Sequence, residues 1–170
     1  MRTTNNLILF WRGILSNWAI TPYEFGGEQY CCAEQQYMKY KAMHFGDLDC
    51  AVKIMDSTNP KEIKRLGRSV RYYNDAEWSK VRAGYMLQCV RAKFKGNEKA
   101  RKFLLKQPPH HTFAEASPFD TIWGIGYGED EAPAHDMTTW RGQNLLGQCL
   151  TQVYNELKWE PNLFDNELDT

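Results

Sequence analysis

The chain has 170 residues, which fits a single domain that can bury a core of its own. It carries 21 Lys and Arg against 21 Asp and Glu, so the formal net charge is zero. This balance disfavours a strongly basic nucleic-acid binder but leaves room for a local basic patch. No apolar run approaches the roughly 20 residues of a membrane span, and residues 1–6 are too polar for a signal peptide. We therefore expect a soluble cytoplasmic protein without membrane contact.

The cysteines and histidines do not have the spacing of metal ligands. Cys31 and Cys32 are adjacent, which suits neither an ordinary disulfide nor a CxxC metal pair. His110 and His111 are also adjacent and have no ligand spacing to a cysteine. We expect reduced thiols, no metal and no cofactor.

Start and stop signals along the chain predict mostly helices. Asn59 and Asn74 are each followed three residues later by a glutamate, the pattern of a capping box. In chain order we predict a strand at 7–11, helices at about 31–45, after Asp47, from Asn59 to near Gly67, at about 75–95 and at about 98–106, a short strand within 111–117, and a last helix at about 140–158. The fold class is therefore mainly α with a few short strands. Residues 1–158 are expected to form one compact domain, and residues 159–170 an acidic tail.

The helix at 31–45 contains an unusual arrangement of one acid and one lysine. Glu34, Met38 and Lys41 lie at positions i, i+4 and i+7, so they share one face. Most charged side chains are solvated, so one interpretation is a surface acid and a surface lysine beside a core stripe. The other is a pair of reactive groups.

Two further segments carry candidate residues, and each has a structural alternative. Trp78 lies near a helix start, where it could be a stacking platform or a core residue. Residues 118–136 form a long glycine-rich loop, and such loops are often functional. In this loop Asp120 could act as a carboxylate or only cap a turn. The glycines of GIGYG do not have the GxGxxG spacing of dinucleotide folds and could instead allow backbone to approach a ligand. Arg141 could be solvated, and Asn144 could face a neighbouring turn.

Six segments together resemble the NADAR family of YbiA-like N-glycosidases. In order they are LSNW (15–18), EQYCCAEQQYMKYKAMHFGD (28–47), LGRSVR (66–71), Trp78 with RAKF (91–94), FAEASPFDTIWGIG (113–126) and WRGQNLLG (140–147). The resemblance covers about residues 9–157 and implies a single NADAR/YbiA-like domain. One departure is that Gln35 and Met38 stand where many members have His and Gln, which affects the expected substrate more than the reaction.

The resemblance implies hydrolysis of the bond between an anomeric ribose carbon and a base or amine nitrogen. Glu34 and Asp120 would form a carboxylate pair, and Lys41 could attack the sugar as an amine. The implied substrate-binding residues are Asn17, Arg68, Trp78, Trp123, Gly124, Arg141 and Asn144, with the two arginines as candidates for phosphate or pyrophosphate.

Three functions remain open from the sequence. The first is an N-glycosidase that removes ADP-ribose from guanine, as a free nucleotide or in nucleic acid, or one that hydrolyses phosphoribosylamino-pyrimidine intermediates of riboflavin synthesis. The second is a module that binds ADP-ribose or a nucleotide without cleaving it. The third is a purely structural helical domain. The trio of Glu34, Lys41 and Asp120 favours the first, because pure binding has little need of it.

Overall fold

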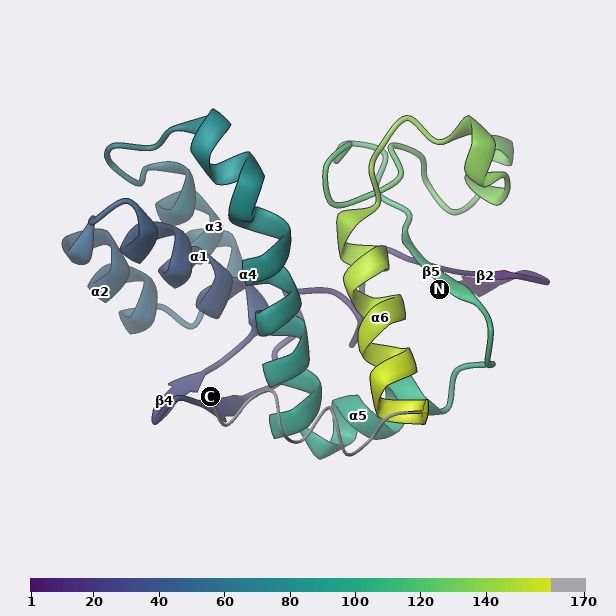
Figure 1. The fold of residues 1–170 in the computed structure, drawn as a ribbon, viewed down its shortest axis with the longest axis horizontal. Helices are drawn as coiled ribbons and strands as arrows, with labels where there is room; N and C mark the ends of the chain where they lie inside the picture. Colours follow the sequence, from purple (N-terminus) through teal and green to yellow (C-terminus); the bar gives the residue numbers. More distant parts are fainter. Residues whose placement is uncertain (160–170) are drawn as a thin grey trace. The chain divides into compact units, whose positions relative to one another are not determined.

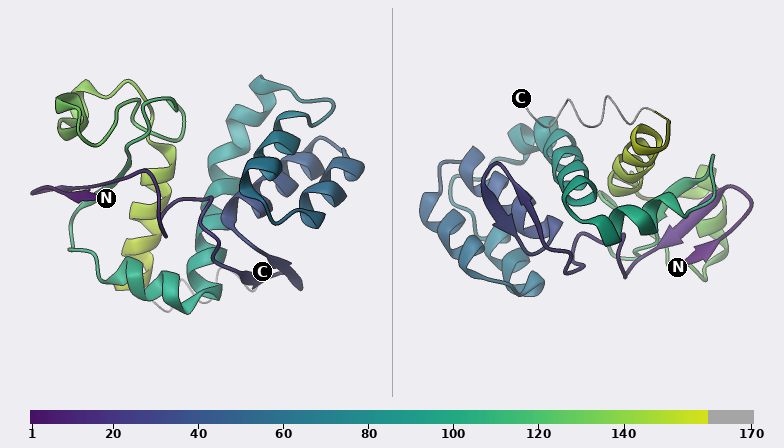
Figure 2. Two further views of the ribbon diagram at one scale, coloured as in Figure 1. Left: turned by 180° about the vertical axis from the view of Figure 1, so that it is seen from behind. Right: turned by 90° about the horizontal axis from the view of Figure 1, so that it is seen from below.

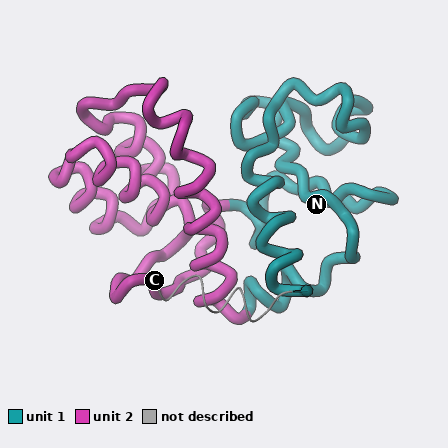
Figure 3. Tube along the Cα trace, in the orientation of Figure 1, with its two compact units in different colours: residues 1–16, 99–170 teal, residues 17–98 magenta. Residues whose placement is uncertain are grey.

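A computed structural model describes residues 1–159, and the chain divides into two compact units (Figure 3). One unit consists of residues 17–98, and the other of residues 1–16 with the chain from residue 99 onward. The expected single domain over residues 1–158 stays a prediction. The expected acidic tail, apart from Trp159, lies outside the described residues.

The fold class expected from the sequence is confirmed. Over residues 1–159 the chain forms six α-helices and five strands of two to four residues. None of these helices combines the length and hydrophobicity of a transmembrane span. The elements are β1 (Arg2–Thr3), β2 (Leu7–Phe10), β3 (Tyr23–Phe25), β4 (Glu28–Tyr30), α1 (Ala33–His44), α2 (Leu48–Asp56), α3 (Pro60–Arg68), α4 (Asp75–Gly96), α5 (Glu98–Leu105), β5 (Thr112–Glu115), the 3-10 turns η1 (Ala132–His135) and η2 (Met137–Thr139), and α6 (Leu145–Trp159).

Helix α1 is the centre of the unit formed by residues 17–98. It packs against α2, α3 and α4 (Figure 1), and seven of its twelve residues are buried. Because α1 has neighbours on several sides, polar positions such as Gln35 and Gln36 are buried along with apolar ones. Their amides are paired: Gln35 Nε2 donates to the carbonyl of Ser57 at 2.9 Å, and Gln36 Oε1 accepts from the Tyr23 hydroxyl at 2.6 Å.

Side-chain caps fix the starts of the three helices that follow α1. Asp47 accepts from the Cys50 amide at 3.3 Å, Asn59 from Lys61 at 3.0 Å, and Asn74 from Glu77 at 3.0 Å. Each cap satisfies an amide that the helix itself cannot pair. The helix starts predicted at these three residues are therefore confirmed.

A β-hairpin precedes α1 and was not predicted. Strands β3 and β4 pair antiparallel through Tyr23 and Tyr30, and β3 also packs on α4 (Figure 2). Gly26 and Gly27 form the turn with φ angles of 60° and 77°, which favour glycine. Strands of three residues are too short to show an alternating pattern in the sequence.

The other unit is built on a small sheet with the order β1-β2-β5. Strands β2 and β5 are parallel, with Leu7 opposite Thr112, and all four residues of β2 are fully buried. Helix α6 packs on β5 (Figure 1). The unit therefore joins the two ends of the described chain in one core.

The last helix begins five residues later than predicted, at Leu145 instead of residue 140. Asn144 has a φ of 54°, which lies outside the right-handed helical region. Its side chain accepts from the Glu115 amide and donates to the Phe113 carbonyl, both in β5. Gly142 lies against Gly124 so closely that a Cβ there would be 2.1 Å from the Gly124 carbonyl oxygen. These tertiary contacts hold residues 140–144 in a turn.

Gly147 provides a test of the packing between α6 and β5. A Cβ at Gly147 would lie 2.1 Å from the backbone oxygen of Phe113, which cannot move aside without disturbing β5. We expect Gly147→Ala to lower the free energy of unfolding by about 1–3 kcal/mol. Gly84→Ala is the matched control, because a Cβ there meets nothing within 4 Å, and it should raise that free energy by about 0.5–1 kcal/mol. Urea unfolding of both variants measures the difference, and equal effects would contradict this packing.

Candidate functional site

The face of α1 that carries Glu34, Met38 and Lys41 lies against α3. Lys64 of α3 reaches Glu34, with 3.1 Å between Lys64 Nζ and Glu34 Oε1. One turn further along α1, a Cβ added at Gly67 would lie 1.9 Å from the Met38 sulfur, so the two helices are in direct contact there. At the end of the face, Lys41 Nζ donates to the Gly67 carbonyl at 2.8 Å. The expected shared face is therefore confirmed, and it faces a neighbouring helix.

Glu34 is a buried carboxylate in the first turn of α1. Its residue is 2% exposed, and its backbone amide donates to the Asn17 carbonyl at 3.0 Å. The contact with Lys64 is at ion-pair distance but does not have hydrogen-bond geometry, and Oε1 has no hydrogen-bond partner among residues 1–159. Buried carboxylates that are only structural are normally fully hydrogen-bonded, so this oxygen, with an ion pair but no hydrogen bond, makes Glu34 a candidate for contact with a ligand.

Lys41 is a half-buried amine held beside a second cation. Its Nζ lies 4.0 Å from the centre of the Tyr73 ring. Burial lowers the pKa of Lys41, and the nearby charge of Lys64 lowers it further. Weaker attractions from Cys50, Asp75 and Glu34 act in the opposite direction. A larger fraction of this amine is neutral at a given pH than for a solvated lysine, which is the state a nucleophilic amine needs.

A second set of polar atoms lies where α1 meets α4. The Asn17 side chain donates from Nδ2 to the Met86 sulfur at 3.1 Å, and its Oδ1 is buried without a hydrogen-bond partner among residues 1–159. Arg82 lies one turn before Met86 on α4, and its Nε is likewise buried and unpaired in the described chain. Tyr37 is close enough to both Glu34 and Arg82 to be influenced by their charges. Burial raises the pKa of Tyr37 most, Glu34 raises it further, and Arg82 lowers it.

Trp78 lies one further turn before Arg82 and belongs to an aromatic cluster. Trp78 is 5% exposed, and its ring stacks on Tyr85 with centroids 5.5 Å apart. The ring centroids of Tyr37 and His44 lie 5.4 and 5.7 Å from that of Trp78. The structure thus gives Trp78 a packing role in the core of this unit. Stacking on a substrate stays a prediction.

Asp120 belongs to the other unit, where it caps a turn. Its Oδ1 accepts from the amides of Ile122 at 2.9 Å and Trp123 at 2.8 Å. The half-buried Trp123 is held by this cap and by the amide of Leu146, which donates to its carbonyl at 3.2 Å. Pairing of Asp120 with Glu34 stays a prediction.

Gly124, Arg141 and Asn144 make contacts within the same unit. The glycine allows close approach of the protein's own backbone, since a Cβ on Gly124 would lie 2.8 Å from the Glu115 oxygen. The exposed Arg141 guanidinium lies 4.4 Å from the centre of the Tyr127 ring. Asn144 is 2% exposed, accepts from the Glu115 amide at 3.0 Å and donates to the Phe113 carbonyl at 2.9 Å. The structure thus gives Asn144 a role in holding β5, and substrate contacts of all three residues stay predictions.

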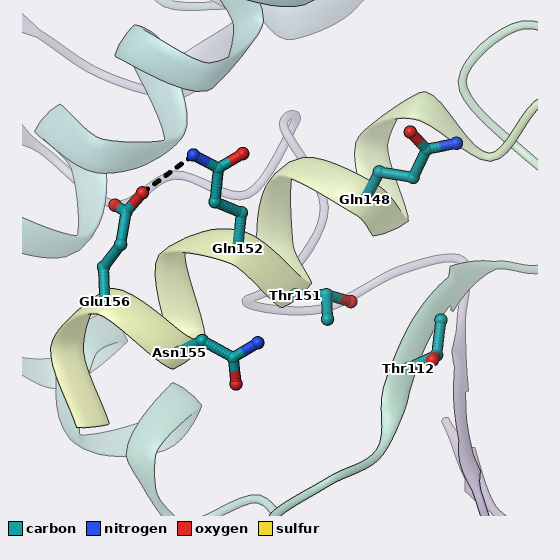
Figure 4. A pocket seen from close by; sticks show the side chains of 6 residues that line it. All are labelled: Thr112, Gln148, Thr151, Gln152, Asn155 and Glu156. Carbon is teal, nitrogen blue, oxygen red and sulfur yellow. Dashed lines mark hydrogen bonds between the residues drawn. The ribbon is translucent and has the colours of Figure 1, made fainter. Parts of the chain in front are cut away.

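This unit also has an open pocket of about 530 Å³ along α6 (Figure 4). Its side chains are polar, and Gln152 donates to Glu156 at 2.9 Å within it. It is lined by Thr112, Gln148, Thr151, Gln152, Asn155 and Glu156. None of the residues predicted from the sequence lines it, and it holds no cation for a phosphate.

Comparison with known proteins identifies the family. The sequence model of the NADAR domain matches residues 9–158. This chain belongs to the NADAR domain family. Relatives of this NADAR chain include protein irg-1 of Caenorhabditis elegans, 37% identical over 76% of the chain, and N-glycosidase R617 of Acanthamoeba polyphaga mimivirus, 37% identical over 84%. N-glycosidase YbiA of Escherichia coli is 26% identical over 87%.

The NADAR chain covers these relatives to different extents. It spans 61% of the length of irg-1, 86% of R617 and 83% of YbiA. The NMR structure of Escherichia coli YbiA has a TM-score of 0.75 to it at 25% identity, covering 95% of this chain and 90% of that one. The family resemblance and the fold that it implied are therefore confirmed.

Two residues of the NADAR site were missed by sequence reasoning. From the sequence, Lys64 is predicted to be a surface charge on a short helix. The packing of α3 on α1 brings its side chain to Glu34. Arg82 reads as one of several charges on α4. A signal was available for it, because Trp78, Arg82 and Met86 are spaced by four residues and must share a face.

The influence of Lys64 on Lys41 can be measured directly. Lys64→Gln removes a positive neighbour, so we expect the pKa of Lys41 to rise toward its usual value and its neutral form to appear only at higher pH. Heteronuclear NMR of side-chain-labelled lysine over a pH series measures this, with Lys41→Met to assign the signal. The control is Lys80→Gln on the exposed side of α4, which should leave the titration unchanged. A Lys41 titration that is the same in the Lys64 variant would contradict the arrangement.

Proposed function

We propose that this NADAR chain is an N-glycosidase that hydrolyses the bond between an anomeric ribose carbon and a base or amine nitrogen. The reaction class is supported by the family and by the two relatives named N-glycosidases, R617 and YbiA. For the substrate, we propose that the enzyme removes ADP-ribose from guanine, in a free nucleotide or in ADP-ribosylated nucleic acid. This finer assignment follows from the resemblance of the site segments.

The observation that carries the proposal is the pair of groups on one face of α1. Glu34 is buried with an oxygen that no hydrogen bond occupies, and Lys41 is an amine with a lowered pKa. Seven residues of helix separate them by roughly 10 Å along the axis, about the span of a sugar with its leaving group. Two such groups on a rigid element, one paired with Lys64 and the other with a pKa that Lys64 helps to lower, are expected at a reacting centre.

The chemistry needs a proton for the leaving nitrogen and stabilisation of the anomeric carbon. When the carbon–nitrogen bond breaks, its electron pair goes to the base nitrogen, which takes up a proton through Glu34. Positive charge then develops on the sugar, which a second carboxylate stabilises. The family resemblance assigns that role to Asp120. Water adds to the carbon to complete the hydrolysis, and the proton that it loses passes through Glu34 to the base nitrogen.

Lys41 offers a covalent route to the same products. If the ribose ring opens, the neutral Nζ attacks the anomeric carbon, and the base leaves with a proton. The resulting imine links Lys41 to the open sugar, and one water molecule releases the sugar aldehyde and restores the amine. Protons pass through Glu34 in both halves, so no oxidant or other co-reactant is needed.

Two other functions remain as second candidates. Hydrolysis of phosphoribosylamino-pyrimidine intermediates of riboflavin synthesis would use the same groups with a smaller leaving base. A non-catalytic module for ADP-ribose or a nucleotide would need a binding site for its ligand, but it would not need a buried carboxylate oxygen without a hydrogen bond, such as Glu34 Oε1. A panel of ribosylated bases, including ADP-ribosylated guanosine and the early riboflavin precursors, separates all three when the released products are identified by mass spectrometry.

Glu34→Gln tests the acid/base role with little change of shape. General acid–base groups typically contribute about 10²–10⁴-fold, so we expect kcat to fall by at least about 100-fold while substrate still binds. Glu24→Gln on the exposed part of the hairpin makes the same chemical change away from the site and should keep full activity. Turnover by Glu34→Gln at the normal rate would show that the assignment is wrong.

Borohydride trapping tests the covalent route. Reduction during turnover should fix the sugar on Lys41, and peptide mapping must separate this site from Lys93, whose burial lowers its pKa to about 7. Lys41→Arg keeps a donor near the Gly67 carbonyl but cannot form an imine, so trapping should vanish. An adduct that persists in this variant, or that maps to Lys93, would rule out Lys41 as the nucleophile.

A further inference from the structure

Helix α3 forms one wall of a second pocket on the unit that carries Glu34. The pocket has a volume of about 410 Å³, and Arg68, predicted from the sequence to contact phosphate, lines it. Its lining is dominated by cations, in contrast to the pocket along α6. The lining residues are Trp18, Asn59, Lys61, Glu62, Lys64, Arg65 and Arg68.

The four cations form one continuous stripe along α3. Lys61, Lys64, Arg65 and Arg68 lie at positions i, i+3, i+4 and i+7, the spacing of a single helix face. The opposite side of α3 is apolar and buried, through Ile63, Leu66 and Gly67. The helix is thereby fixed on α1 and presents its charged face outward from a rigid base.

This concentration of positive charge is only partly neutralised by the protein. Arg65 forms two hydrogen bonds with Glu62, at 2.8 and 2.6 Å, and Lys64 contacts Glu34. Lys61 and Arg68 form no ion pair with any residue in 1–159. In a chain whose net charge is zero, such a local excess is a specific feature of this surface.

The rest of the lining suits a nucleotide-like anion. Trp18 is 44% exposed and offers a flat apolar ring at the edge of the cations. Asn59 uses its Oδ1 to cap α3, so its Nδ2 group is left as a neutral donor at the helix start. One arginine guanidinium can bind two phosphate oxygens at once, and an aromatic ring can stack on a nucleobase.

We propose that the α3 pocket binds the phosphate or pyrophosphate group of the substrate, with Trp18 against its base or sugar, and that Lys64 links this subsite to Glu34. The inference rests on the proposed function, because it assigns the anionic end of the same ligand. Lys64 is the decisive residue: it lines the pocket, and its Nζ is 3.1 Å from the carboxylate of Glu34. A phosphate held by α3 would therefore direct the attached ribose toward Glu34 on α1.

Inorganic pyrophosphate is the probe for this subsite, because its binding does not depend on turnover. Calorimetry on the full chain should show binding that weakens about tenfold in Lys61→Ala and in Arg65→Ala, and about 100-fold in the double variant. Lys80→Ala removes an exposed lysine of the same unit outside the pocket and should retain the original affinity. Inorganic phosphate in a parallel arm distinguishes a single phosphate site from a pyrophosphate site.

Kinetics on a cleaved riboside separate the two proposals from each other. The α3 variants should raise KM for a phosphorylated substrate by the same factor as they weaken pyrophosphate, and raise it far less for the phosphate-free riboside. If pyrophosphate binding is lost in the variants but no riboside is cleaved, the subsite stands and the proposed function fails. The subsite is overturned if pyrophosphate does not bind or if the variants bind it with the original affinity.

Discussion

The contact between α1 and α3 is the constraint on which the candidate site depends. Met38 can lie against α3 only because residue 67 has no side chain, since a Cβ there would be 1.9 Å from the Met38 sulfur. The same glycine exposes the carbonyl that receives Lys41. Because the two helices are this close, Lys64 of α3 reaches Glu34 one turn before Met38 on α1. Lys41, one turn after Met38, reaches the Gly67 carbonyl. A single glycine therefore determines the spacing of three charged groups.

That spacing also couples the groups electrostatically. Lys64 attracts the carboxylate of Glu34 and at the same time makes a proton on Lys41 less favourable. An acid and a basic amine that faced each other directly would form an ion pair and hold the amine charged. Here a second lysine pairs with the acid instead, and its charge helps to lower the pKa of Lys41, as the covalent route requires.

Much of the fold could be predicted because its signals are local. Asp47, Asn59 and Asn74 begin helices through bonds to amides at most three residues away, and these bonds can be read from the sequence. The late start of α6 could not be predicted, since it depends on Asn144 bridging to β5, about thirty residues earlier. For the site, helix period predicted the shared face of Glu34 and Lys41 but not that α3 covers it. Lys64 has no local signal, because its role exists only across that interface.

The neighbourhood where α1 packs on α4 gives an independent reason to place a ligand in this unit. The Oδ1 of Asn17, the Oε1 of Glu34 and the Nε of Arg82 are buried without hydrogen bonds among residues 1–159. The Glu34 oxygen has an ion pair with Lys64, but the other two atoms have no such partner among residues 1–159. Leaving a buried polar group unpaired costs about 1–3 kcal/mol, so two of them are a sizeable fraction of the stability of a small domain. Apolar residues of similar size would remove that cost if packing were their only purpose. Their presence in the unit that carries Glu34 is explained if a polar ligand, such as a ribose with its base, completes their hydrogen bonds on binding.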